Sequence, residues 1–140
     1  MGVAEAITRL AALEAVLSGV KRAHDETPES LAEMPAFINY PRRGTITPGD
    51  PPGQIKGLHT IVSELHIARG ILPEAESVAR PFISSFPIKV ADDFNDGKLN
   101  GTVDALLEIR YEYGQLPWGE KEIHMGIRFE TDVKLKEDVA

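Results

Sequence analysis

The sequence contains no cysteine, which excludes disulfides, thiolate metal sites and a cysteine nucleophile and fits a reducing cytoplasm. No apolar run approaches the roughly 18 residues that a membrane-spanning helix needs. Cations are also few, since 15 Lys and Arg against 22 Asp and Glu leave a formal net charge of −7. Phosphate neutralisation requires clustered cations, so this charge argues against a nucleic-acid-binding protein. Glu5, Arg9 and Glu14 interrupt residues 1–20, which are therefore unlike a secretory signal peptide.

Motifs for catalysis and metal binding are missing as well. The four histidines lack His-Glu-x-x-His or comparable metal-ligand spacing. There is neither a Gly-x-Ser-x-Gly elbow nor a phosphate-binding Gly-x-x-x-x-Gly-Lys loop. Residues 92–97 (DDFNDG) place Phe94 where a calcium loop needs an oxygen ligand. We therefore expect no enzyme, no cofactor and no bound metal.

Two helices are predicted in a single domain that covers residues 1–140. Apolar residues at three- and four-residue steps predict a helix over residues 3–20. A second helix is expected to begin at Pro73 with carboxylates in its first turn. It is expected to be broken at Pro81 and Pro87, because an internal proline removes a hydrogen bond and clashes one turn back.

The remaining regular segments alternate as strands do. Residues 35–40 and 58–67 have strand character, and residues 103–111 and 123–135 place apolar side chains at every second position. We therefore expect an α+β fold: an antiparallel sheet of about four strands with a long C-terminal β-hairpin, flanked by the N-terminal helix and a proline-broken second helix.

The C-terminal hairpin is long for such a domain. Fully extended, residues 123–135 would span about 40 Å, whereas a compact chain of this length has a diameter of about 37 Å. Either the hairpin bends sharply, or its end projects toward another chain. We favour projection, because an alternating strand that leaves its own core needs another surface to cover its apolar side chains.

Residues 41–57 are predicted to form a long irregular loop. They include four prolines and four glycines and show no sustained periodicity. Arg42, Arg43 and Lys56 face only Asp50 as a countercharge, so this arm is basic on an acidic protein. Two interpretations stay open: the arm docks on an acidic neighbouring surface, or it is a solvated loop.

The tip of the hairpin is the other candidate interface. It carries Leu116, Pro117 and Trp118, the only tryptophan of the chain, between glycines. An indole at a loop tip often anchors an interface, because it buries a large area at little entropic cost. The alternative is a tip that folds back over its own strands. If the interface interpretation is right, Trp118→Ala and the joint change of Arg42 and Arg43 to Ala spare folding and weaken assembly.

Four stretches of the chain carry a family resemblance: 99–104 (LNGTVD), 109–114 (IRYEYG), 116–119 (LPWG) and 126–129 (GIRF). Together with the order helix, strand, long loop, strand, broken helix and long hairpin, they resemble the neck and tail-completion proteins of long-tailed bacteriophages, in particular the tail terminators. The resemblance covers roughly residues 58–135.

The resemblance implies a structural virion protein that forms a hexameric ring at the head–tail interface. Such a ring terminates polymerisation of the tail tube and joins the tail to the connector. DNA passes through its lumen without specific binding. The implied partners are further copies of the chain, the tail-tube protein and a connector or head-closure protein. Another neck ring or a tail-tube subunit is the alternative in the same class, and a small cytoplasmic ligand-binding protein or enzyme is the alternative in a different class.

Overall fold

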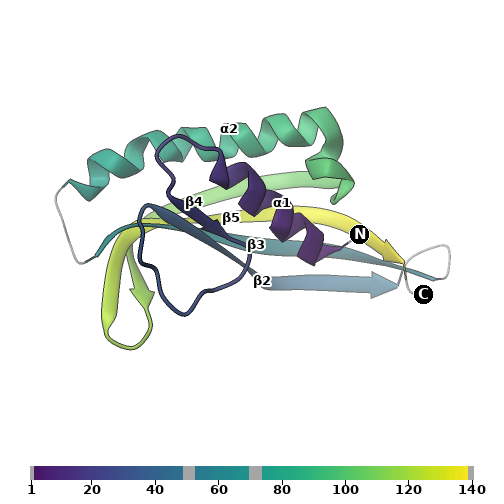
Figure 1. Ribbon diagram of the computed structural model, residues 1–140. Helices are drawn as coiled ribbons and strands as arrows, with labels where there is room; N and C mark the ends of the chain where they lie inside the picture. Colours follow the sequence, from purple (N-terminus) through teal and green to yellow (C-terminus); the bar gives the residue numbers. More distant parts are fainter. Residues whose placement is uncertain (1, 49–52, 70–73, 139–140) are drawn as a thin grey trace.

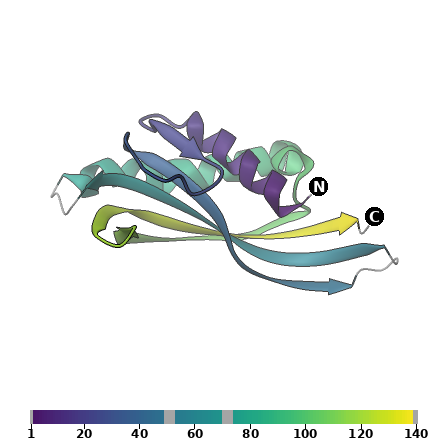
Figure 2. The same ribbon diagram turned by 60° about the horizontal axis from the view of Figure 1, so that its bottom comes forward.

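A computed structural model of the chain describes residues 2–48, 53–69 and 74–138. Both described helices lie on the same face of a five-stranded sheet (Figures 1 and 2). The order of the strands is β1-β2-β3-β5-β4, with β1 parallel to β2 and every other pair antiparallel. The α+β class is therefore confirmed. The elements are α1 Val3–Ala15, β1 Arg22–His24, β2 Ala36–Pro48, β3 Gln54–Arg69, α2 Ala75–Gly101, β4 Ala105–Trp118 and β5 Glu122–Asp138.

The core lies between the helices and the sheet. Every second residue of β5 from Met125 to Leu135 is buried there, as the alternation of the sequence predicts. Three rings stack at its centre: the centroid of Phe86 lies 4.4 Å from that of Phe129 and 5.5 Å from that of Phe37. Burial of each such side chain contributes about 1.5–3 kcal/mol, so this contact holds α2 on the sheet.

The predicted loop over residues 41–57 is wrong. β2 and β3 run through most of this segment as a paired hairpin, from Ala36 opposite His66 to Pro48 opposite Ile55, with a β-bulge between Pro41 and Arg43. Residues 49–52 lie outside the described part of the chain. β2 pairs with β1 only as far as Ile38, so beyond that residue it is an edge strand, where proline is tolerated. Gly44 and Gly57 reflect close packing: a Cβ on Gly57 would lie 2.1 Å from Nε2 of His59.

The second helix is not broken at its prolines. α2 continues through Pro81 and Pro87, and non-helical backbone angles begin at Gly97. The buried face of Phe82, Phe86 and Val90 keeps both prolines within one helix. The predicted start at Pro73 lies outside the described residues. After Gly97, residues 98–100 adopt left-handed conformations (φ 53–58°) and turn the chain toward β4.

The first helix ends at Ala15, earlier than predicted, and buries a carboxyl group just before its end. Glu14 is fully buried, and its Oε1 accepts a hydrogen bond of 2.6 Å from the side-chain amide of Asn39. Asn39 in turn accepts one of 2.6 Å from Ser63. Oε2 of Glu14 has no partner among the described residues. Burial raises the pKa of Glu14 well above its ordinary value of 4.5, and the bond from Asn39 offsets only part of this effect.

We expect Glu14→Gln to make the protein less sensitive to alkaline pH. Between pH 4.5 and the raised folded-state pKa of Glu14, the unfolded chain holds fewer protons than the folded chain, so stability falls as the pH rises. Glutamine keeps the acceptor for Asn39 but never ionises. Urea unfolding at a series of pH values measures the effect. At the most alkaline pH, the free energy of unfolding of the glutamine variant should exceed that of the wild type by about 1–3 kcal/mol. Parallel pH profiles for the two proteins would contradict this.

Candidate functional site

We call the sheet surface that points away from the helices the open face. It carries the side chains that alternate with the core residues along β2, β3, β5 and β4. Its composition changes along the strands. The end near β1 carries aromatic and histidine side chains, the middle carries ion pairs, and the end near the β2–β3 turn carries lysines. This surface contains most of the polar contacts between strands and is the candidate functional site.

A histidine pair lies at the aromatic end. His66 on β3 and His124 on β5 are both 0% exposed, and their Nδ1 atoms are 2.9 Å apart, so one nitrogen donates and the other accepts. Trp118 covers them, with its ring centroid 5.9 Å from that of His124 and 5.5 Å from that of His66. The shared bond holds a single proton. The two rings therefore cannot both be cations while it persists.

Glu64 connects this pair to the rest of the open face. Its carboxylate accepts hydrogen bonds from the Tyr40 hydroxyl (2.6 Å), from Nε and Nη2 of Arg128 (3.2 and 3.0 Å) and from Nε2 of His66 (3.0 Å). Burial alone would raise the pKa of Glu64, but these bonds together lower it. Burial and the neighbouring carboxylate raise the pKa of Tyr40 to about 12. Glu64 is thus ionised, with its charge balanced by Arg128.

A histidine beside a carboxylate has the composition of a general base, yet this pair is not placed like one. Nδ1 of His66 is bonded to His124 and Nε2 to Glu64, so neither nitrogen is free to take a proton from a substrate. An adjacent hollow of about 450 Å³ is lined by Tyr40, Glu64, Trp118 and Arg128. The network is suited to fixing the position of Trp118.

We expect acid to destabilise this end of the open face. Burial lowers the pKa of His124, and the nearby His66 lowers it further against the opposing effect of Glu122. A histidine with a lowered folded-state pKa contributes stability that is complete above about pH 6.5 and is lost as the pH falls through that value. Urea unfolding at pH 7.5 and 5.5, followed by Trp118 fluorescence, measures the loss. In the His124→Phe variant, the loss of unfolding free energy between pH 7.5 and pH 5.5 should be smaller. An unchanged pH dependence in that variant would contradict the role of His124.

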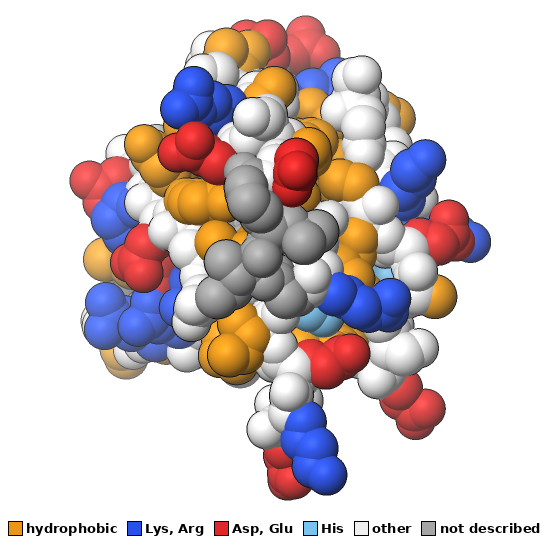
Figure 3. Space-filling model, turned by 90° about the vertical axis from the view of Figure 1, so that its left-hand side faces the viewer, with side chains coloured by type: hydrophobic (Ala, Val, Ile, Leu, Met, Phe, Trp, Pro, Cys, Tyr) orange, Lys and Arg blue, Asp and Glu red, His pale blue; other side chains and the backbone are white. Residues whose placement is uncertain are grey.

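The structure shows that the hairpin bends near its tip. The β4–β5 turn curves away from the helix layer (Figure 1), and Trp118 packs with Leu31, Ala36 and Ile38 of its own chain. Leu116 is 3% exposed, so it is a core residue here, whereas Pro117 is exposed. Figure 3, which looks onto this end of the molecule, shows acidic, basic and apolar side chains intermixed. Contact of Pro117 or Trp118 with another subunit stays a prediction.

Ion pairs occupy the middle of the open face. Arg42 pairs with Glu130, and Nη1 of Arg110 lies 2.5 Å from Oδ2 of Asp132. Thr60 donates a hydrogen bond of 2.7 Å to the same carboxylate. The bond from Arg110 is the main reason that the pKa of Asp132 is lowered. Arg42 is therefore a neutralised strand residue rather than part of a free basic loop.

The third region, which we call the basic end, consists of Arg43, Lys56, Lys134 and Lys136. Lys56 on β3 stands directly opposite Lys136 on β5, and Lys134 stands opposite Leu58 one row away. Arg43, Lys134 and Lys136 are exposed, and Lys56 is partly buried. Among the described residues none of the four forms an ion pair. The structure thus places the predicted residues Arg43 and Lys56 together, on one rigid sheet surface.

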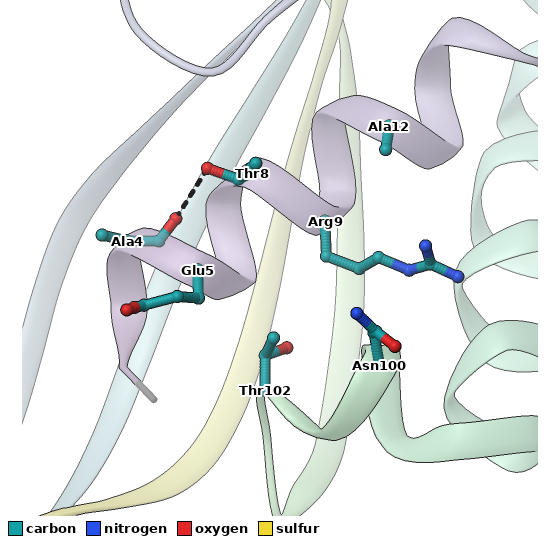
Figure 4. Close-up of a pocket in the computed structure, with 7 residues that line it drawn as sticks. All are labelled: Ala4, Glu5, Thr8, Arg9, Ala12, Asn100 and Thr102. Atoms are coloured by element: carbon teal, nitrogen blue, oxygen red, sulfur yellow. Dashed lines mark hydrogen bonds between the residues drawn. The ribbon is translucent and has the colours of Figure 1, made fainter.

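A second hollow of about 490 Å³ lies on the other side of the molecule, between α1 and the end of α2 (Figure 4). Arg9 extends from α1 toward α2, where Nη2 lies 2.6 Å from Oδ1 of Asp93. Glu5 accepts a hydrogen bond of 3.0 Å from the backbone of Gly2. Since both charged side chains are already paired, this hollow offers little to orient a polar ligand.

The histidine network was missed by inspection of the sequence. Glu64 and His66 are two residues apart on one strand, which places them on the same face, and this signal was available. His124 gave no such signal, because it meets His66 only through the β3–β5 register. Within residues 2–48, 53–69 and 74–138, no cluster of three or more His, Cys, Asp or Glu could hold a metal ion.

Neither of the described helices is long and apolar enough to cross a bilayer. Comparison of the sequence with known proteins adds no assignment: no family model and no curated protein matches it.

Proposed function

We propose that the chain is a structural subunit of a phage virion, a tail-terminator-like protein that forms a hexameric ring where the tail meets the head. In this role it ends polymerisation of the tail tube, joins the tail to the connector and leaves a passage for DNA. The resemblance of the C-terminal hairpin motivates the family. The α+β fold, with its N-terminal helix and long hairpin, agrees with the architecture that the resemblance implies.

The observation that carries the proposal is the open face. Neither of the described helices covers the open face of the five-stranded sheet, and that face differs in character from one end to the other. Ring subunits meet head to tail, so that one surface of each copy contacts a different surface of the next. The open face and the acidic remainder of the molecule supply unlike surfaces of this kind.

Assembly of tail tubes in the presence of the purified chain tests this function. Tube protein of the same phage is polymerised with and without the chain, and tube lengths are measured by electron microscopy. We expect a fixed, short length distribution when the chain is present, because a terminator blocks further addition. If tubes elongate equally in both reactions and the chain does not sediment with them, the proposed function is wrong.

A further inference from the structure

We propose that the basic end of the open face binds the acidic segment 25–34 of a second copy of this chain, so that copies join head to tail. The inference rests on the proposed ring function and names the two surfaces that would meet in the ring. It is carried by the strand register, by the distribution of charge and by two exposed leucines.

The basic end is built from like charges that face one another. Lys56 and Lys136 are direct cross-strand neighbours on the open face, an arrangement that destabilises an isolated sheet. Asp132 stands two rows away on the same face, and Arg110 and Thr60 already bond to its carboxylate. A carboxylate from outside the chain would relieve this repulsion.

Exposed apolar side chains lie beside these cations. Leu58 is 49% exposed and Leu107 is 56% exposed, and both line a hollow of about 230 Å³ that also borders Arg43 and Thr45. Protein interfaces combine an apolar centre with a polar rim. The basic end has both parts, which favours a protein segment over a free anion as its occupant.

The acidic segment supplies the complementary charge. Residues 25–34 contain four carboxylates and no Lys or Arg. Glu26 and Glu29 are exposed and have no partner among the described residues, whereas Asp25 accepts a hydrogen bond from Thr8 and Glu33 pairs with Arg22. Leu31 packs on Ala36 and Ile38, so the segment is held against the open face of its own chain at the aromatic end.

The two surfaces lie at opposite ends of one strand. The acidic segment immediately precedes Ala36, where β2 begins, and the basic end includes Lys56, which pairs with Thr47 near the end of β2. About 11 residues of strand separate them, or roughly 35 Å. One copy therefore cannot satisfy its own basic end. Repetition of the contact gives a head-to-tail assembly that closes into a ring when the rotation allows.

Charge reversal tests the contact. One variant carries Lys56→Glu with Lys136→Glu, and another carries Glu26→Lys with Glu29→Lys. Each variant alone places like charges at every contact, so self-association measured by sedimentation should weaken at least about tenfold. An equimolar mixture restores opposite charges at both contacts of an alternating assembly and should return to within about threefold of the wild type. The control, Lys89→Glu with Lys98→Glu on α2, should associate like the wild type.

Folding of the variants is checked by circular dichroism. If the double lysine variant unfolds, the single change Lys136→Glu takes its place, because it sets a carboxylate opposite Lys56 and should stabilise the sheet while it weakens association. Association of the variants equal to that of the wild type, or a mixture that is not rescued, would overturn the inference. So would a wild-type chain that is monomeric at every concentration, or a basic end that binds duplex DNA in place of a second copy.

These outcomes are distinct from failure of the proposed function. If the chain shortens tail tubes but the charge reversals do not change its self-association, the terminator role stands and the proposed contact is wrong. If the chain self-associates through these surfaces but has no effect on tube length, the proposed contact stands and the terminator role is wrong.

Discussion

Gly126→Ala should lower the free energy of unfolding by about 3 kcal/mol, the upper range for overpacking of a well-filled site. A Cβ at position 126 would lie 2.0 Å from the backbone oxygen of Leu65 and 2.7 Å from Cδ1 of Leu116. The first of these atoms belongs to the backbone of the neighbouring strand β3, so it cannot move without disturbing the β3–β5 ladder. Urea denaturation monitored by circular dichroism measures the change.

Gly114→Ala is the matched control. Gly114 lies directly opposite Gly126 in the β4–β5 register, and an added Cβ there meets nothing within 4 Å. The same chemical change should therefore be neutral or stabilise by about 0.4–1 kcal/mol through the unfolded chain. Equal losses in the two variants would show that general strand propensity, and not close packing beneath Leu116, determines the effect.

Trp118→Ala is expected to lower the free energy of unfolding by roughly 2–3 kcal/mol, somewhat less than truncation of a fully buried tryptophan. The sequence alone predicted that this change spares folding. In the structure the indole covers His66 and His124 and packs on Ile38, so its loss exposes a histidine pair that is otherwise sealed from water. Circular dichroism follows unfolding, because the substitution removes the only tryptophan.

Trp118→Phe separates packing from interface effects. A phenyl ring keeps the stacking on His124, so the free energy of unfolding of this variant should fall by less than about 1 kcal/mol. A Trp118→Ala protein as stable as the wild type but defective in assembly would instead mean that the indole acts on another subunit.

The fold was predictable where one periodicity covers a whole element. β5 alternates with a single break at Thr131, and its buried apolar residues from Met125 to Leu135 follow the sequence pattern. β4 does not, because a bulge between Leu106 and Glu108 shifts the alternation, so Leu107 is exposed and Leu106 packs on the core. A bulge adds one residue to one strand and leaves no mark in composition.

The glycines and prolines of residues 41–57 led to the wrong prediction of a loop where β2 and β3 pair. Both residues are typical of loops, yet here they mark an unpaired edge and close approaches to His59. The candidate site was less predictable still. Arg43 and Lys56 were identified by charge, but their convergence with Lys134 and Lys136 depends on the β3–β5 register. Glu14 lies within the predicted apolar stripe, four residues after Leu10, but its polar partner Asn39 comes from a distant strand.

Electron microscopy of purified tail tubes incubated with the chain tests directly whether it forms a terminator ring. We expect a closed ring of copies seated on one end of each tube, with the open face of each copy against its neighbour. Bare tube ends, together with a chain that stays monomeric in the same mixture, would contradict it.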